Sequence, residues 1–351
     1  MKNKQPLFLL VNDIHLTKDN CDLVYNIFEQ VISFCRKNKV NNVVIGGDMF
    51  TNRSGQPLSV LLACLRCFNL LSVNDIELFI IPGNHDKTDA NADESYLDVF
   101  RNCDGVTIIR REKIITLNNC DIYFIPYYGR EVWLERFEKL MKRRAAIEDY
   151  AAKRKRILIT HVAIDGVRNN DGSIVSGEID GDKFDWFDEV FVGHYHNASD
   201  IGKNIHYTGS AYQKDYGEDI DKGFTIVYND ATWEKINSDF PRYIKEVVQA
   251  DDVQGLRNVL EKYEGVEDNV RIVIRGSKVD CEKINVNDIR LKYGVDVKVQ
   301  TDEELEAMEV SQNDTIQFDK VSIKKDFIRF CADNGIKGDK FKFGLDLIKG
   351  I

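Results

Sequence analysis

The segment Phe79-Ile80-Ile81-Pro82-Gly83-Asn84-His85-Asp86 decides the expected fold. Here an apolar run stops at a glycine, and three side chains that can bind metal or move protons follow at once. An apolar run that ends in Pro-Gly is typical of a buried strand. In a parallel sheet, ligands bind at the carboxyl ends of the strands. We therefore expect Asn84, His85 and Asp86 to lie at the mouth of an active site.

The same pattern recurs elsewhere in the chain, where further apolar runs end abruptly in Asp, His or Asn. Between these runs, Leu23 to Cys35 and Pro57 to Leu71 carry apolar residues at helical spacing. Strands that alternate with helices predict an α/β layered fold with a mainly parallel sheet, rather than a helix bundle or an all-β sandwich. The four further runs are Phe8 to His15, Val43 to Asp48, Ile157 to His161 and Val190 to His196.

Later parts of the chain follow other patterns. Short apolar segments at 106–109, 114–117 and 120–125 stand close together, which predicts an antiparallel portion of the sheet. Pro241 marks the expected boundary to a small α+β module without any histidine, and an acidic stretch with an amphipathic helix follows that module. We therefore expect three parts, 1–240, 241–300 and 301–351.

Composition bounds the class of protein. With 351 residues, of which 43% are hydrophobic, the chain can bury a large core in two or more domains. The eight cysteines are scattered, show no secreted-type framework and predict reduced thiols. No apolar run approaches the length of a membrane span, and Met1 to Pro6 carries no cleavage site. We expect a cytoplasmic protein without a membrane partner.

The net charge of -10 argues against a protein that coats itself in nucleic acid by bulk electrostatics. It does not exclude a nucleic-acid enzyme, because bound divalent cations locally invert the sign of a carboxylate-rich site. The basic stretch Lys139 to Arg156 leaves two interpretations open, a face that contacts phosphates or a solvated helix surface.

Five of the six histidines lie in the strand-end motifs, and this clustering is the strongest chemical signal in the chain. Imidazoles mixed with carboxylate and amide oxygens favour manganese or iron, leave zinc open and disfavour a thiolate-bound zinc. A two-metal site needs a bridging carboxylate, and Asp48, on a central strand, is the natural bridge. The sixth histidine, His206, lies within a strand, where packing or a hydrogen bond is favoured over metal binding.

In their order and spacing, the strand-end motifs resemble the signature of calcineurin-like metallophosphoesterases. The motifs are Asp13-Ile14-His15, Gly47-Asp48, Gly83-Asn84-His85-Asp86, His161 and Gly193-His194-Tyr195-His196. Within that superfamily, the chain resembles the SbcD-type DNA repair nucleases and their phage recombination-endonuclease counterparts. The features that carry this closer resemblance are the first motif, the GNHD motif, and Tyr207 to Ala211 followed by Gly217-Glu218 and Lys222-Gly223.

The resemblance implies a fold and a set of site residues. The fold would be a mixed β sandwich flanked by helices, with a smaller α+β capping domain and a C-terminal helical segment. Two divalent ions are implied, with manganese favoured and iron, magnesium or zinc as alternatives. His85 would stay outside the metal shell and stabilise or protonate the leaving oxygen, and Asp86 would orient His85. One ion would be held by Asp13, His15, Asp48 and His196, and the other by Asp48, Asn84, His161 and His194.

The resemblance also implies a function. This chain would be a two-metal DNA phosphodiesterase, an exonuclease or endonuclease subunit acting in repair or recombination with a separate SbcC-like ATPase, which the C-terminal segment would dock. A homodimer would form through Pro57 to Leu71 and Glu94 to Arg101. The compact length favours a phage over a bacterial origin.

Two rival functions stay open at this point. One is a metallophosphoesterase that acts on a cyclic nucleotide, a nucleotide or a phosphoprotein, and the other is a non-catalytic scaffold that keeps the metal site for shape. Met49 to Arg53 lacks the second Asp and the Arg-Gly of the protein phosphatases, which disfavours a phosphatase. The intact His85 and Asp86 disfavour the scaffold.

Overall fold

The computed structural model describes residues 4–145, 154–168, 173–176 and 178–304, together with the single positions 327, 331 and 341. It divides into two compact units, Met1–Ile244 with Glu267–Asn269, and Lys245–Val266 with Val270–Ile351. All residues that the sequence assigns to the active site lie in the first unit. The three-part division into 1–240, 241–300 and 301–351 stays a prediction, and most of the third part lies outside the described residues.

The first unit is built on two six-stranded sheets. In spatial order, the first sheet contains β12 (Trp233–Asn237), β11 (Gly223–Tyr228), β1 (Pro6–Val11), β2 (Asn42–Ile45), β3 (Glu77–Ile80) and β4 (Val106–Ile108). The second contains β5 (Lys113–Leu117), β6 (Cys120–Ile125), β7 (Lys155–His161), β8 (Glu189–Gly193), β10 (Ile205–Tyr207) and β9 (Ser199–Ile201). Phe8, Phe124 and Phe191 belong to one buried apolar cluster that draws on both sheets, so the sheets pack face to face.

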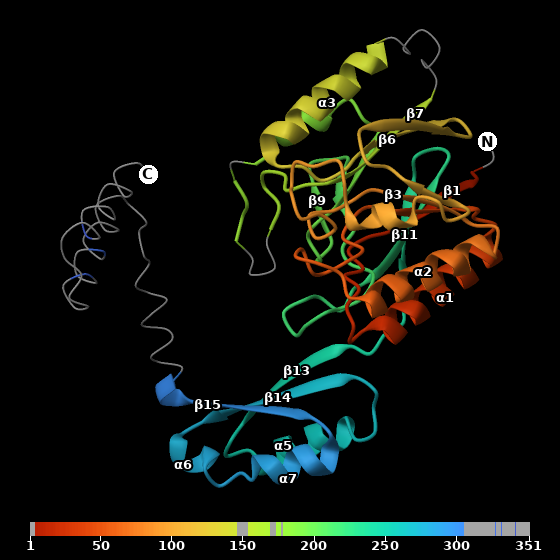
Figure 1. Ribbon diagram of the computed structural model, residues 1–351. Helices are drawn as coiled ribbons and strands as arrows, with labels where there is room; N and C mark the ends of the chain where they lie inside the picture. The colour runs from red at the N-terminus through yellow and green to blue at the C-terminus, as the bar shows by residue number, and fades with distance from the viewer. Residues whose placement is uncertain are drawn as a thin grey trace. The chain divides into compact units, whose positions relative to one another are not determined.

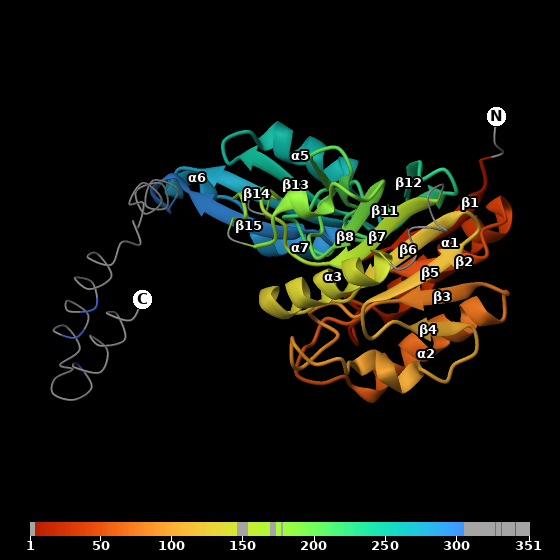
Figure 2. The same ribbon diagram turned by 90° about the horizontal axis from the view of Figure 1, so that it is seen from above.

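The central strands of both sheets are parallel. In the first sheet, β1, β2, β3 and β4 run in one direction, side by side in Figure 2. In the second, β6, β7, β8 and β10 are likewise parallel. The carboxyl ends of neighbouring parallel strands therefore meet at one edge of each sheet.

The expected antiparallel portion is confirmed only in part. Strand β5 pairs antiparallel with β6, as the closely spaced apolar segments predict. Strand β4 instead runs parallel to β3 at the edge of the other sheet, with Leu78 opposite Val106. Spacing along the chain did not reveal that the polypeptide crosses from one sheet to the other between β4 and β5.

Helices cover the outer faces of the sandwich. Helices α1 (Cys21–Asn38) and α2 (Leu58–Ser72) pack on the first sheet, where Phe28 and Phe68 share a buried cluster with strand residues. Helix α3 (Arg130–Ala145) packs on the second sheet through Trp133, on the opposite side of the sandwich (Figure 1). The α/β sandwich flanked by helices is thus confirmed. The short 3-10 turns are η1 (Tyr96–Phe100) and η2 (Gly181–Phe184), so Glu94 to Arg101 forms only a 3-10 turn.

The second unit is a small α+β module, as the sequence predicts. Its three-stranded sheet contains β13 (Tyr243–Gln249), β14 (Asn269–Gly276) and β15 (Asp296–Thr301). The accompanying helices are α5 (Val253–Lys262), α6 (Lys278–Cys281) and α7 (Val286–Tyr293). None of the helices in the described ranges combines the length and the apolar character that crossing a bilayer requires. All eight cysteines are free thiols, as expected.

His206 is hydrogen-bonded on both sides of its ring, which confirms the interpretation favoured from the sequence. Its Nδ1 lies 2.6 Å from Asp200 Oδ1, and its Nε2 lies 2.8 Å from Glu189 Oε2. Trp233 packs beside the ring, 4.7 Å away between centroids. Burial lowers the pKa of His206, but the two carboxylates outweigh burial and leave the pKa raised.

We expect His206→Gln to destabilise the fold in a pH-dependent way. The pKa of His206 is higher in the folded state than the value of about 6.5 in the unfolded state, so binding a proton stabilises the fold. This stabilisation is complete below the unfolded-state pKa and is lost as the pH rises through the folded-state pKa. At about pH 6 the substitution should lower the free energy of unfolding by about 1–3 kcal/mol, and at about pH 9 by much less. Urea unfolding at both pH values checks this, and an equal loss at both would contradict it.

Candidate metal centre

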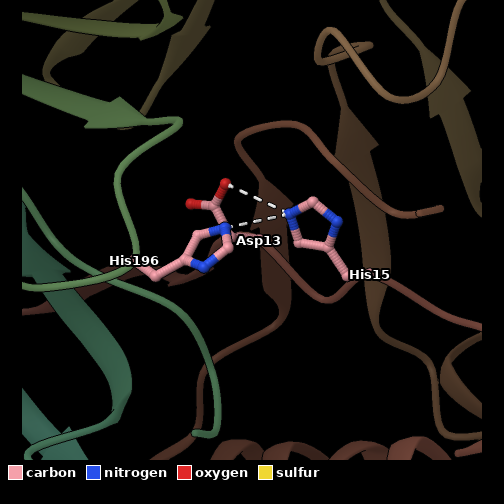
Figure 3. Close-up of side chains that lie close together, drawn as sticks. All are labelled: Asp13, His15 and His196. Atoms are coloured by element: carbon pink, nitrogen blue, oxygen red, sulfur yellow. Dashed lines mark hydrogen bonds and ion pairs between the residues drawn. The ribbon is translucent and has the colours of Figure 1, made fainter. Parts of the chain in front are cut away.

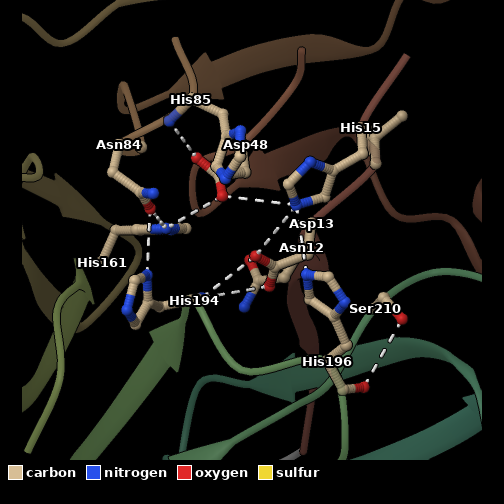
Figure 4. A network of polar contacts seen from close by, with 12 residues as sticks. Asn12, Asp13, His15, Asp48, Asn84, His85, His161, His194, His196 and Ser210 are labelled. Carbon is tan, nitrogen blue, oxygen red and sulfur yellow. Dashed lines mark hydrogen bonds and ion pairs between the residues drawn. The ribbon is translucent and has the colours of Figure 1, made fainter. Parts of the chain in front are cut away.

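The two sheets bring the sequence-assigned residues to the carboxyl edges of their parallel strands, and Figure 4 shows eight of the nine together, all except Asp86. This arrangement follows from the fold, because each residue stands at or just after the end of a buried strand. The first sheet supplies Asp13 and His15 after β1, Asp48 after β2, and Asn84, His85 and Asp86 after β3. The second sheet supplies His161 at the end of β7, and His194 and His196 after β8.

A first cluster joins Asp13, His15 and His196, whose ligand atoms lie within 4.8 Å of one another (Figure 3). The Nε2 atoms of His15 and His196 are 3.2 Å apart. His15 Nε2 also lies 3.3 Å from Asp48 Oδ2 and 4.0 Å from Asp13 Oδ1. The cluster thus points two imidazoles and two carboxylates at a common point.

A second cluster joins Asp48, Asn84, His161 and His194. His161 Nε2 lies 3.4 Å from Asp48 Oδ2 and 3.0 Å from Asn84 Oδ1. Asn84 Oδ1 is in turn 2.9 Å from His194 Nδ1. Because the same oxygen, Asp48 Oδ2, faces both clusters, the Asp48 carboxylate stands between them as a bridge would.

Outer partners fix the protons of two of these histidines. His161 Nδ1 lies 3.0 Å from the carbonyl oxygen of Gly46, and His196 Nδ1 lies 2.6 Å from Glu218 Oε1. Carbonyl and carboxylate oxygens only accept, so in both rings Nδ1 donates and Nε2 is the nitrogen that faces the cluster. Metal-bound histidines are held in this way. Together with the hard oxygens of Asp13, Asp48 and Asn84, the donor set fits divalent cations such as manganese or iron.

Unusual backbone conformations accompany the cluster. Four of its residues have a left-handed backbone: φ is 52° at Asp13, 51° at His15, 55° at Asp48 and 100° at His194. Non-glycine residues rarely adopt this conformation, and such strain concentrates at functional sites.

Glycines allow the cluster to close. A Cβ atom on Gly83 would lie 2.2 Å from Asp48 Oδ1 and 2.4 Å from the Asp48 backbone nitrogen. At Gly47 φ is 110°, and a Cβ there would lie 2.3 Å from His161 Nδ1. Gly83 is required because the chain approaches Asp48 closely there. Gly47 is required because of both its close approach to His161 and its positive φ.

Charges within the site reinforce one another. Burial alone would raise the pKa of Asp48, but the His161 and His15 imidazoles hold it well below its usual range. Burial lowers the pKa of His15 to about 3, and Lys214 acts in the same direction. Asp48 is therefore a carboxylate and His15 a neutral imidazole, which are the protonation states that bind cations.

His85 lies beside the first cluster, but both of its ring nitrogens contact protein groups. Nδ1 is 2.5 Å from the Thr51 carbonyl oxygen, and Nε2 is 3.2 Å from Arg53 Nη2. The carbonyl accepts and the guanidinium donates, so His85 carries its proton on Nδ1. The backbone of Arg53 is anchored by the Tyr96 hydroxyl, which donates to its carbonyl oxygen at 2.9 Å.

The resemblance seen in the sequence implies that Asp86 orients His85. In the structure, the hydrogen bonds of the Asp86 carboxylate go to backbone nitrogens instead. Oδ2 accepts from the backbone nitrogens of Gly83 at 2.8 Å and Met49 at 3.3 Å, and Oδ1 accepts from Phe50 N at 2.9 Å. Asp86 therefore ties the loop after β3 to the loop after β2. The segment after Asp48, rather than Asp86, orients His85.

Sequence reasoning assigned no role to several residues at this site: Arg53, Lys214, Glu218 and Lys222. Lys214 Nζ lies 3.0 Å from His196 Nε2, and Lys222 Nζ donates to the His196 carbonyl oxygen at 2.6 Å. The motifs Gly217-Glu218 and Lys222-Gly223 were a signal for two of them. Their contact with His196 depends on how the chain after β10 folds back, which the spacing does not reveal.

Part of the basic stretch on α3 serves internal ion pairs. Glu112, buried, lies 3.3 Å from Lys139 Nζ and 3.6 Å from Arg143 Nη1, and Arg136 contacts it at 3.3 Å. These three cations are therefore already partnered by a carboxylate. Residues 146–153 of the stretch lie outside the described residues.

We expect Gly83→Ala to disrupt the cluster, because the added methyl group collides with Asp48. The affinity for Mn²⁺ should fall by at least about tenfold, as for the loss of a group that orients a ligand. Gly55→Ala is the matched control, since a Cβ there meets nothing within 4 Å. Calorimetric titration with Mn²⁺ checks both variants, and equal affinities would contradict the geometry.

A family model matches the larger unit of this chain, and one known protein aligns with nearly its whole length. The calcineurin-like phosphoesterase model matches residues 6–198. The DNA double-strand break repair protein Mre11 of Methanocaldococcus jannaschii is 24% identical over 356 residues, which cover 95% of this chain and 92% of that protein. The SbcD component of the SbcCD nuclease of Staphylococcus saprophyticus is 25% identical, over 57% of this chain and 58% of that protein. Protein 078R of Invertebrate iridescent virus 3, named as a candidate phosphoesterase, is 26% identical, over 72% of each chain.

The family match spans more than half of the 351 residues and includes every side chain of the two clusters. Its boundaries also follow the sandwich from β1 to the loop after β8. This chain therefore belongs to the calcineurin-like phosphoesterase family and is a metallophosphoesterase.

Proposed function

We propose that this chain is a two-metal DNA phosphodiesterase, the nuclease subunit of a repair or recombination complex. The observation that carries the proposal is the pair of donor clusters that share Asp48 Oδ2, with the His85 ring, held by Thr51 and Arg53, next to His15 and Asp48. The choice of DNA is supported by the match to Mre11, a DNA double-strand break repair protein, which extends over 95% of this chain and so includes the second unit.

The ligands follow from the two clusters. Asp13, His15 and His196 with Asp48 would hold one ion, and Asn84, His161 and His194 with Asp48 the other. Manganese is the favoured ion, with iron, magnesium and zinc as alternatives. Bound there, two divalent ions supply positive charge for the phosphate oxygens and lower the pKa of a water molecule that can attack phosphorus.

The chain's own residues supply orientation and a proton. Thr51 holds the Nδ1 proton of His85, so Nε2 is the atom at which His85 can exchange a proton with the leaving oxygen. Arg53, whose guanidinium lies 3.2 Å from Nε2, donates to a phosphate oxygen drawn into the same place. Asp86 keeps the loops that carry Asp48 and His85 at a fixed distance.

Partners are part of the proposal. Leu58 and Leu62 on α2 are 71% and 50% exposed, and Val99 on η1 is 66% exposed, which supports a homodimer through these elements. A separate SbcC-like ATPase would gate the nuclease. We assign its docking to the segment 316–351, which lies outside the described residues apart from three single positions.

A second candidate function is hydrolysis of a small phosphodiester. It is favoured by the candidate phosphoesterases of Invertebrate iridescent virus 3 and Invertebrate iridescent virus 6, each of which matches 72% of this chain. Their names specify no nucleic acid. The metal clusters alone serve either substrate, so the substrate has to be tested directly.

We expect the purified chain to cut linear DNA with Mn²⁺ and to lose this activity with chelator. His85→Ala should lower the cleavage rate by about 100- to 10,000-fold, the usual contribution of a proton-transferring side chain, and keep Mn²⁺ binding. Asp48→Asn should lose both, since it removes the shared charge. His206→Gln is the matched control, because its ring lies outside both clusters, and it should retain full activity.

Bis-p-nitrophenyl phosphate distinguishes the two candidate substrates. Turnover of this diester without cleavage of single- or double-stranded DNA, even with a candidate ATPase present, would favour the small substrate. DNA cleavage that survives His85→Ala unchanged would contradict the catalytic assignment of His85.

Deletion of residues 316–351 tests the partner. We expect the shortened chain to hydrolyse bis-p-nitrophenyl phosphate like the full chain, because every assigned site residue lies before residue 200. Co-purification with an SbcC-like ATPase should be lost. An ATPase that still co-purifies would show that docking lies elsewhere in the chain.

A further inference from the structure

Behind His196 lies a buried ion pair whose role the proposed reaction does not explain. The side chains of Glu218 and Lys222 are 1% and 0% exposed, and Lys222 Nζ lies 3.1 Å from Glu218 Oε2. Burying a carboxylate and an ammonium costs several kcal/mol each, and their mutual attraction rarely returns more than that cost. A buried pair of this kind is therefore better explained by what it holds than by added stability.

What the pair holds is His196. Glu218 Oε1 accepts from His196 Nδ1 at 2.6 Å, and Lys222 Nζ donates to the His196 carbonyl oxygen at 2.6 Å. The ring and the backbone of one residue are thus held by two partners that are also paired with each other. Lys222 donates to Asn197 Oδ1 at 3.0 Å as well, which ties the next residue to the same group.

The surrounding loop fixes Glu218 in turn. The backbone nitrogen of Lys214 donates to Glu218 Oε2 at 3.2 Å, and Gln213 Nε2 donates to the Glu218 carbonyl oxygen at 2.8 Å. The Lys214 ammonium also lies beside the imidazole, with Nζ 3.0 Å from His196 Nε2 and 3.5 Å from His196 Nδ1. The Glu218 contact places a ring proton of His196 on Nδ1, because a carboxylate oxygen only accepts.

The two clusters differ in this outer support. In the second cluster, His161 Nδ1 is held by the neutral carbonyl group of Gly46. In the first, His196 Nδ1 is held by a charged carboxylate. A carboxylate partner makes an imidazole a stronger donor as well as orienting it. The structure describes all seven assigned ligands. Among them, the hydrogen bond and ion pair of the Glu218 side chain go to His196.

We propose that Glu218, held in place by Lys222, is a positioning residue that sets the metal affinity of the first cluster without setting that of the second. The inference rests on the proposed function, in which His196 is a ligand. Glu218 acts through His196 and contacts neither ion nor substrate. Its loss should therefore separate the two ions by affinity, because only one of them depends on the His196 ring.

Calorimetric titration of the full chain with Mn²⁺ tests this without measuring activity. The unsubstituted chain should bind two ions. Glu218→Gln keeps the size of the side chain and removes its charge, and it should weaken one ion by about 10- to 100-fold and leave the other unchanged. Glu218→Asp, which keeps the charge on a shorter side chain, should recover part of the loss. The matched control is Glu189→Gln, which removes the carboxylate from His206 and should leave both affinities unchanged.

Each outcome decides between explanations. Unchanged Mn²⁺ binding in Glu218→Gln, or equal weakening of both ions, would overturn the inference. So would a Glu218→Gln variant that fails to fold while Glu218→Asp folds and binds both ions like the unsubstituted chain. His196→Ala separates this test from the proposed function: if His196→Ala also leaves Mn²⁺ binding unchanged, the ligand assignment itself is wrong. If His196→Ala weakens one ion and Glu218→Gln does not, only the role of Glu218 is wrong.

Discussion

The Asp48 carboxylate is the constraint on which the rest of the site depends. Its Oδ2 atom faces His15 at 3.3 Å and His161 at 3.4 Å, and its Oδ1 atom accepts from the backbone nitrogen of His85 at 2.8 Å. One side chain thus orders residues from three strand ends. Such a position is costly, because the carboxylate is buried and its backbone has a positive φ. The neighbouring imidazoles and the glycine at position 83 make that position tolerable.

The site contains two kinds of residue, those assigned to bind metal and those that hold them in place. The assigned ligand atoms come from residues at or just after strand ends, where the backbone is fixed by the sheet. Asp86, Glu218 and Lys222 supply support, and each of them reaches a backbone group or a ligand from behind. Arg53 and Thr51 do the same for His85. Preorganisation of this kind lets a phosphoesterase orient a reacting phosphate without rearranging its own side chains.

Much of the fold and of the site could be predicted from the sequence because polar residues directly after buried strands are a local pattern. Asn84 and His161 could be found in this way, since strand ends in parallel sheets meet. Other features depend on contacts between distant segments. Periodicity indicated strands but not that they divide between two sheets, and it did not place β4 beside β3. The contact between Glu218 and His196 joins residues on separate loops, and the His85 ring is held by Thr51 rather than by Asp86.

The packing of the two sheets has a consequence for how this protein tolerates change. Asp13, His15, Asp48 and Asn84 stand on one sheet, and the three other histidines assigned as ligands, His161, His194 and His196, stand on the other. The apolar layer that contains Phe8, Phe124 and Phe191 is therefore the spacer that sets the width of the gap between two half-sites. Protein interiors are dense and transmit small shifts, so a change of volume in that layer slides one half-site against the other. Substitutions in this apolar layer, far from the assigned ligands, can thus change the affinity for metal. Sequence change in the core is therefore coupled to change in the activity of the site.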